Sequence, residues 1–217
     1  MIPLKDNIPS YHAPVVTVGL IAVNVLVYVN QMMLSPQAAV QFIHLYGLIP
    51  LEISSGELMI PHPVPLYATL FTSMFVHGGL FHLGGNMLYL WIFGDNVEDR
   101  MGRLKFLIFY LLSGLGAAAT QIGANSDSQI PMVGASGAIS GVLGAYLLLF
   151  PSARVLTLIP LGFFTRIVEI PALIVLGFWI IVQILNGVMT LGAQVGGVAW
   201  FAHVGGFVAG LIMVVIL

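Results

Sequence analysis

The chain has 217 residues, of which 59% are hydrophobic and only 6% are charged. Because a soluble domain carries about a quarter charged residues, this chain cannot cover a water-facing surface, and lipid must surround much of it. The net charge of −2 and the lack of a basic run argue against nucleic acid as a partner, and the absence of Cys excludes disulfides and thiolate chemistry.

Apolar stretches long enough to cross a bilayer recur along the whole chain. A helix needs about 20 such residues to cross the hydrocarbon core. Six stretches qualify, at residues 15–33, 67–93, 106–122, 134–150, 170–187 and 198–217. The first has no signal-peptide cleavage pattern, so we expect it to be retained. The sequence therefore predicts an all-α polytopic membrane protein in which residues 1–217 form a single membrane domain with six transmembrane helices.

The basic residues predict the orientation of these spans. Connections 95–105 and 151–169 hold five of the six Lys and Arg residues, and the sixth, Lys5, precedes the first span. By the positive-inside rule, both termini are expected in the cytoplasm. The long connection 35–66 is rich in proline and contains only segments too short to span, so we expect it to be membrane-associated.

Polar side chains inside a span are costly and tend to face the bundle interior or a cavity. Three amides are interpreted as hydrogen-bonded packing groups between helices: Asn24, Gln183 and Asn186. His77 is expected to cap the outer end of the second span. In the same span, within FVHGGLFHLGGNMLYL, His82 and Asn86 are four residues apart and therefore share one helix face.

Small residues dominate one face of the fourth and sixth spans. Ser136 opens the face of GASGAISGVLG, and the stretch AWFAHVGGFVAG places His203 on one face with Gly206 and Gly210. Two faces with so little bulk can pack closely. This packing would bring Ser136 within hydrogen-bond reach of His203, below the outer membrane surface.

A serine beside a histidine is suited to acyl transfer, since the imidazole can take the hydroxyl proton. The free N–H groups at the start of the fourth helix, with Asn86 and His82, could stabilise the developing oxyanion. No carboxylate lies near His203 in the sequence or at matching depth in another span. The pattern therefore predicts a Ser–His dyad rather than a triad.

The residues in this order resemble the rhomboid family of intramembrane serine proteases. The matching motifs are HGGLFHLGGNMLYLWIFG at 77–94, followed by Glu98, Arg100 and Gly102, then GASG at 134–137 and AHVGG at 202–206. The resemblance implies a rhomboid-like helical bundle with these roles: Ser136 as nucleophile, His203 as general base, Asn86 and His82 as the oxyanion site, and Gly134 as the position where substrate backbone comes close.

The resemblance also assigns the connecting segments and shows one departure. It implies that 35–66 is a membrane-embedded side loop, and that the fifth span with 188–197 forms a mobile gate and cap. Several family members have an aromatic residue four positions after the nucleophile, stacked on the base. Here that position is Ser140. The orientation of His203 is therefore expected to come from packing or from another hydrogen bond.

The implied activity is that of a serine endopeptidase that cleaves transmembrane segments of single-span membrane proteins through an acyl-enzyme, without cofactor or metal, in a bacterial inner membrane. One alternative is a catalytically silent rhomboid-like protein that binds membrane clients. Another is a small transporter or channel, which the lack of mid-span Asp, Glu, Lys or Arg disfavours. A zinc protease would need H-E-x-x-H, which is absent, and an aspartyl protease would need two membrane Asp residues.

Overall fold

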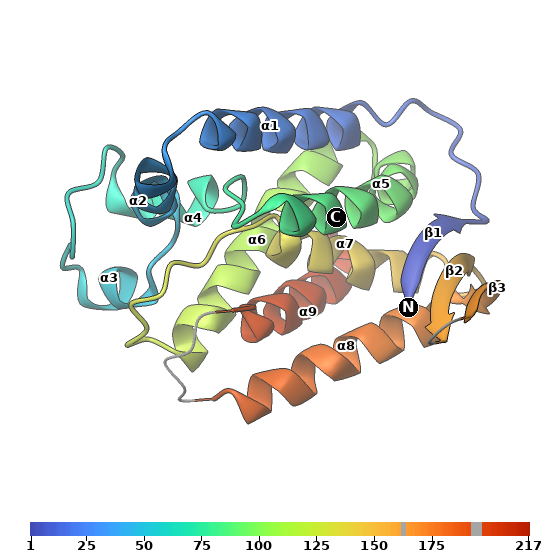
Figure 1. Ribbon diagram of the computed structural model, residues 1–217. Coiled ribbons are helices and arrows are strands. Elements are labelled where there is room, and N and C mark those ends of the chain that lie inside the picture. Colours follow the sequence, from blue (N-terminus) through green and yellow to red (C-terminus); the bar gives the residue numbers. More distant parts are fainter. Residues whose placement is uncertain (162–163, 192–196) are drawn as a thin grey trace.

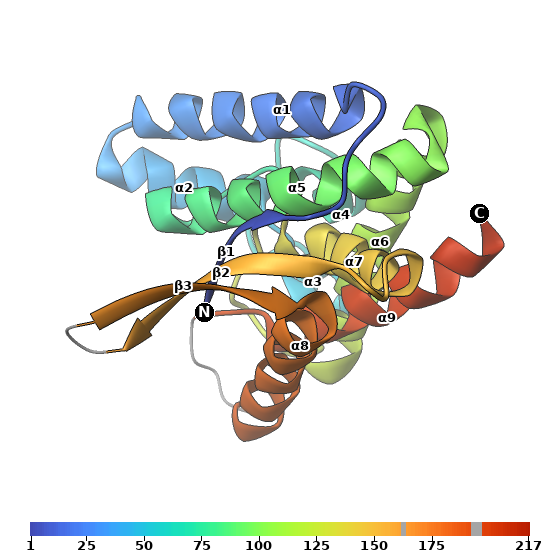
Figure 2. The ribbon, with the colours of Figure 1, turned by 90° about the vertical axis from the view of Figure 1, so that its right-hand side faces the viewer.

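The computed structural model describes residues 1–161, 164–191 and 197–217. Its main body is a bundle of helices (Figure 1): α1 (Val15–Met32), α5 (Leu80–Met101), α6 (Arg103–Ala124), α7 (Ser136–Leu149), α8 (Ala172–Met189) and α9 (Trp200–Ile216). Helix α7 packs against α5, α6 and α9 and forms the centre of the bundle. Helices α1 and α8 lie on opposite flanks (Figures 1 and 2).

Short elements connect α1 to α5 at one end of the bundle. They are α2 (Pro36–Tyr46), α3 (Pro50–Ser55), the 3-10 turn η1 (Leu66–Ala68) and α4 (Thr69–Thr72). A buried pair holds this connection together, because Glu52 and His62 approach to 2.8 Å with side chains no more than 1% exposed. A bridge between Leu48 and Met132 then ties the connection to the segment that precedes α7.

The predicted second span, 67–93, has the wrong bounds. Residues 66–72 form only η1 and α4, and the long helix begins at Leu80, after Gly79. The helix then runs through the charged stretch that was predicted to be a loop. It ends at Met101, before Gly102, whose φ of 81° lies in the left-handed region that favours glycine.

Polar partners explain why α5 continues so far. The Glu98 carboxylate accepts hydrogen bonds from the backbone N–H groups of Val16 and Thr17 at the start of α1. Asp99 accepts from the backbone N–H groups of Tyr11 and His12. The charged end of α5 is thus hydrogen-bonded to the N-terminal segment and the start of α1. The charges in the sequence do not reveal these partners, so they predicted a loop.

Among the described residues, three helices have the length and composition needed to cross a membrane. They are α1, α6 and α8. Helices α7 and α9 are apolar but have 14 and 17 residues, so α7 is only about 21 Å long at 1.5 Å per residue. The structure therefore supports a mostly helical, membrane-embedded protein, while six crossings and cytoplasmic termini stay predictions.

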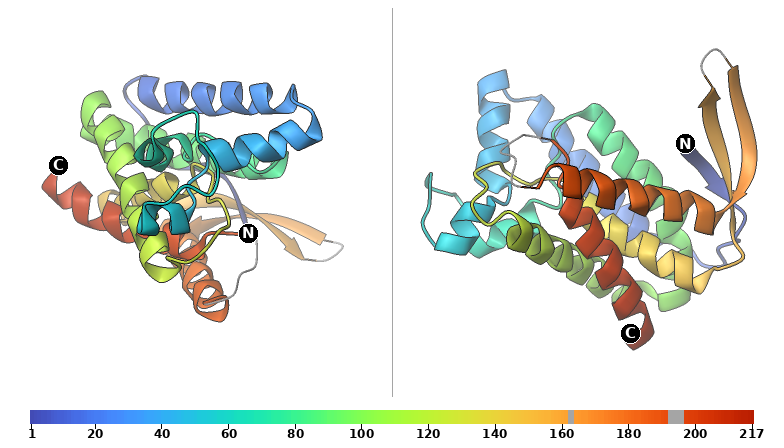
Figure 3. Two further views of the ribbon diagram at one scale, coloured as in Figure 1. Left: turned by 90° about the vertical axis from the view of Figure 1, so that its left-hand side faces the viewer. Right: turned by 90° about the horizontal axis from the view of Figure 1, so that it is seen from below.

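The prediction of an all-α protein was wrong in one respect, because a small sheet lies beside the helices. Its antiparallel strands lie in the order β1 (Ile2–Asp6), β2 (Arg154–Leu161) and β3 (Phe164–Pro171). In the pair of β1 with β2, Ile2 lies opposite Leu158. In the pair of β2 with β3, Arg154 lies opposite Pro171. The sheet lies at the end of the bundle opposite α2 and α3 (Figures 1 and 3).

The sheet end of the molecule gathers the basic side chains. Lys5, Arg154 and Arg166 are in the three strands, and Arg100, Arg103 and Lys105 are at the junction of α5 and α6. The N-terminal segment joins the two groups, since Ser10 donates to Asp95 of α5 at 2.7 Å. Basic charge therefore collects at one end, as the positive-inside argument requires, and the orientation of that end toward the cytoplasm stays a prediction.

Candidate active site

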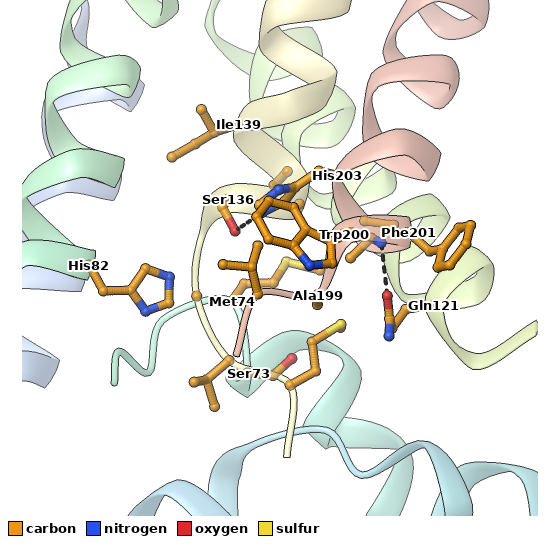
Figure 4. A pocket seen from close by; sticks show the side chains of 18 of the residues that line it. Ser73, Met74, His82, Gln121, Ser136, Ile139, Ala199, Trp200, Phe201 and His203 are labelled. Atoms are coloured by element: carbon orange, nitrogen blue, oxygen red, sulfur yellow. Dashed lines mark hydrogen bonds between the residues drawn. The ribbon is translucent and has the colours of Figure 1, made fainter. Parts of the chain in front are cut away.

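Ser136 is the first residue of α7, and His203 lies in the first turn of α9. The Ser136 Oγ and His203 Nε2 atoms are 2.7 Å apart, a short hydrogen bond between a hydroxyl and an imidazole. His203 is only 9% exposed. Figure 4 shows the two side chains meeting at the edge of a cavity. The structure thus brings together the two groups that acyl transfer needs.

Glycine contacts hold α7 and α9 at this short separation. A Cβ added at Gly206 would overlap the carbonyl oxygen of Gly137, and one at Gly210 would overlap that of Gly141. The two backbones therefore touch without intervening side chains. Gln121 of α6 also fixes the start of α9, because its Oε1 accepts from the Ala202 N–H at 3.1 Å.

Gly134, His82 and Asn86 meet on the other side of Ser136. Gly134 has φ of 119°, and its N–H donates to the Ser73 carbonyl oxygen at 2.8 Å. A Cβ at Gly134 would lie 2.7 Å from His82 Nε2 and 3.5 Å from Asn86 Nδ2. Only glycine therefore fits both the backbone conformation and the contact with these two side chains.

His77 has a different position from the one predicted. It is 1% exposed and does not cap α5, whose N-cap residue is Gly79. Its Nε2 accepts from Asn86 Nδ2 at 2.9 Å, and its backbone exchanges hydrogen bonds with the Gln31 amide of α1. The capping prediction was wrong because the helix begins three residues later than the histidine. His77 instead fixes the amide of Asn86.

The far side of the His203 ring faces α8. His203 Nδ1 is 2.7 Å from Gln183 Oε1, and the Trp179 ring lies 5.7 Å from the imidazole, centroid to centroid. Ser140, at the position where several family members have an aromatic residue, donates to the Ser136 carbonyl oxygen at 2.6 Å. The sequence interpretation took Gln183 as a packing group and missed this contact.

A cavity of about 680 Å³ joins these groups. Its lining includes His82, Asn86, Gly134, Ser136 and His203. In Figure 4 the His82 ring projects into the space below Ser136, with Trp200 on the side of His203. The predicted cap, 188–197, falls partly on residues 192–196, which lie outside the described residues.

Comparisons with known proteins match the same region. The family model described as the Rhomboid domain matches residues 66–217. The rhomboid protease GluP of Bacillus subtilis is 38% identical over 129 residues, 59% of this chain and 24% of that protein. Rhomboid protein 1, mitochondrial, of Saccharomyces cerevisiae is 36% identical over 88 residues, 39% of this chain and 25% of that protein.

A plant relative matches more of the chain. Rhomboid-like protein 11, chloroplastic, of Arabidopsis thaliana is 30% identical over 163 residues, 73% of this chain and 55% of that protein. The chain thus spans roughly a quarter to a half of the length of these relatives.

Proposed function

Because the chain belongs to the rhomboid family, we propose that it is an intramembrane serine endopeptidase that cleaves transmembrane segments of single-span membrane proteins. The observation that carries this proposal is the 2.7 Å contact between Ser136 Oγ and His203 Nε2 at a cavity within the helical bundle. The protease name of the Bacillus subtilis relative agrees with it. Residues 1–217 are proposed to form one membrane domain that crosses the bilayer six times, with both termini in the cytoplasm.

The first chemical step forms the acyl-enzyme. Ser136 Oγ attacks the scissile carbonyl carbon while His203 Nε2 takes the hydroxyl proton. The carbonyl oxygen becomes an oxyanion that accepts hydrogen bonds from the Ser136 N–H, the Asn86 amide and His82. One Asn86 N–H already donates to His77, which leaves the second to point at the oxyanion.

Collapse of the tetrahedral intermediate breaks the C–N bond, and the leaving amine takes the proton from His203. Water then enters the cavity and loses a proton to His203 Nε2 as it attacks the acyl carbon. Ser136 Oγ leaves and recovers that proton, so the dyad returns to its starting state. No cofactor or metal is required by this sequence of steps.

The substrate is expected to unwind before it reacts. A carbonyl inside a transmembrane helix is hydrogen-bonded and shielded, whereas Ser136 needs access to its carbon. Breaking helical hydrogen bonds in lipid costs several kcal/mol for each unsatisfied group. Small or helix-destabilising residues near the cleavage site should therefore favour cleavage, and a substrate stiffened with Leu there should be cut more slowly.

The first test uses purified protein in liposomes with a fluorescent single-span substrate and EDTA present. We expect Ser136→Ala and His203→Ala each to reduce cleavage at least about 1,000-fold, because each removes one half of the dyad. Ser55→Ala and His44→Ala serve as controls, since these residues lie in the 35–66 connection, outside the cavity lining.

Cleavage that persists in both dyad variants would contradict the proposed mechanism. Absence of cleavage by the wild type across several substrates, together with no labelling of Ser136 by a fluorophosphonate probe, would favour a catalytically silent protein that binds membrane clients. The relatives include bacterial, mitochondrial and chloroplast proteins. These relatives do not select one membrane for this chain. The proposed location, the bacterial inner membrane, follows from the sequence interpretation.

A further inference from the structure

We propose that Gln183 of α8 is a positioning residue that fixes both the tautomer and the orientation of His203. The proposal rests on the proposed function, in which His203 is the general base. The contact with Ser136 involves only His203 Nε2, so another group must hold His203 Nδ1. A histidine paired only with a serine has nothing on its second nitrogen to select which nitrogen carries the proton.

The hydrogen bonds of Gln183 determine which end of its amide faces the imidazole. Its Nε2 donates to the carbonyl oxygen of Trp179 at 3.2 Å, so its Oε1 is the atom directed at His203 Nδ1, 2.7 Å away. An amide oxygen only accepts, so Nδ1 must carry the proton. His203 Nε2 then has a free lone pair toward Ser136, as a general base needs.

Packing confines the ring in the same orientation. The Trp179 ring lies 5.7 Å from the imidazole at an interplanar angle of 33°, and the Trp200 ring meets it edge-on at 6.4 Å and 88°. Gln183 and His203 are 5% and 9% exposed. Because water is largely excluded, the hydrogen bond between them is electrostatically stronger than it would be in solvent.

Helix α8 therefore supplies two of the groups that restrain the base. Trp179 and Gln183 are four residues apart, so they share one face of α8. Because residue 140 is serine, the ring has no aromatic partner at the α7 position where several family members carry one. The Ser140 hydroxyl donates to the Ser136 carbonyl oxygen instead. Trp179 provides an aromatic surface from a different helix, and Gln183 provides the hydrogen-bond acceptor.

The test compares Gln183→Met, which keeps the length of the side chain but removes the acceptor, with Gln183→Glu, which keeps an acceptor. Asn186→Leu is the matched control, because the Asn186 amide also bonds to the helix backbone, at Val182, without contacting His203. The first readout is the rate at which a fluorophosphonate labels Ser136, which needs no substrate unwinding. The second is the ¹⁵N NMR signal of His203, identified by its loss in His203→Ala.

We expect Gln183→Met to label about 10- to 100-fold more slowly, a typical effect of losing a group that orients another. Cleavage of the transmembrane substrate should show this loss in kcat with little change in KM. Gln183→Glu should recover most of the rate, and Asn186→Leu should match the wild type. The wild-type His203 signal should be that of the Nδ1–H tautomer.

Two results would overturn the proposal. One is an Nε2–H tautomer in the wild-type protein, a measurement that needs no Gln183 variant to fold. The other is labelling of a folded Gln183→Met at the wild-type rate. Failure of the wild type itself to label would instead count against the proposed function, while the tautomer would still decide whether Gln183 sets the proton position.

Discussion

Glu98 joins two helices through a single buried side chain. Its two carboxylate oxygens accept from the Val16 and Thr17 N–H groups at 2.9 and 2.7 Å, and its side chain belongs to a residue only 2% exposed. The first N–H groups of α1 have no partner within their own helix, and a negative charge there also interacts favourably with the helix dipole. The carboxylate of α5 thus acts as the N-terminal cap of α1.

We expect Glu98→Gln to lower the free energy of unfolding by about 1 to 2 kcal/mol, because the amide keeps one acceptor and loses the charge. Thermal unfolding in detergent measures the change. Glu57→Gln is the control for the loss of one carboxylate, since Glu57 is exposed. Equal stability of the two variants would show that the cap contributes nothing.

At the same residue scale, the candidate site residues could be proposed from the sequence because each sits in a short local motif. The structure places Ser136 against His203, and Gly134 against His82 and Asn86. Gln183 could not be found this way, because its contact with His203 depends on the rotation of α8 about its own axis. An isolated amide in an apolar span gives no sign of that rotation.

The interface between α7 and α9 consists of backbone in direct contact. We expect Gly210→Ala to destabilise the protein by about 1 to 3 kcal/mol, the usual effect of overpacking, because its Cβ would overlap the Gly141 backbone. Activity should fall as well, since separating the helices lengthens the distance between Ser136 and His203. Unfolding temperature and fluorophosphonate labelling measure the two effects.

Gly177→Ala on α8 is the matched control, because an added Cβ there has no neighbour within 4 Å. Alanine is a better helix former than glycine, so this variant should gain about 0.5 to 1 kcal/mol. If both substitutions had the same effect, the close approach of α7 and α9 would not be important for stability.

The helices were predictable because long apolar runs identify them, and α1 matches its predicted span to within one residue. The start of α5 and the sheet were not. The predicted span 67–93 contains no charged residue, so nothing of that kind marks the break at Gly79. Strand β1 pairs with β2, which lies far along the chain at Arg154–Leu161. Pairing between such distant segments leaves no local pattern in a strand of five residues.

The sheet connects the N-terminal segment to the junction of α7 and α8, and Asp6 is a central contact. Tyr146 of α7 donates to its carboxylate. Burial raises the pKa of Asp6 above its ordinary value of 3.8, the charge of Asp95 raises it further, and the hydrogen bond from Tyr146 lowers it. A carboxyl with a higher pKa in the folded state binds protons more tightly when folded, so its contribution makes stability fall as pH rises through that range.

Asp6→Asn keeps an oxygen for Tyr146 and removes the charge. We expect Asp6→Asn to be at least as stable as the wild type at neutral pH. As the pH rises from 3.8 into the mildly acidic range, the stability of the variant should fall less than that of the wild type. Unfolding temperatures measured across this range test the prediction, with Asp127→Asn as the control for net charge. A variant clearly less stable at neutral pH, with unchanged pH dependence, would contradict it.

The pairing of β1 with β2 also has a consequence for biogenesis. The two strands are separated by roughly 150 residues, which a ribosome adds in about 8 to 30 seconds at 5 to 20 residues per second. During that interval α1, α5, α6 and α7 are synthesised while β1 waits without its neighbour. Pro3, Lys5 and Asp6 interrupt its apolar residues, and proline and charge are features that discourage an unpaired strand from joining a wrong one. The composition of this short strand is therefore suited to a long delay as well as to its final place in the sheet.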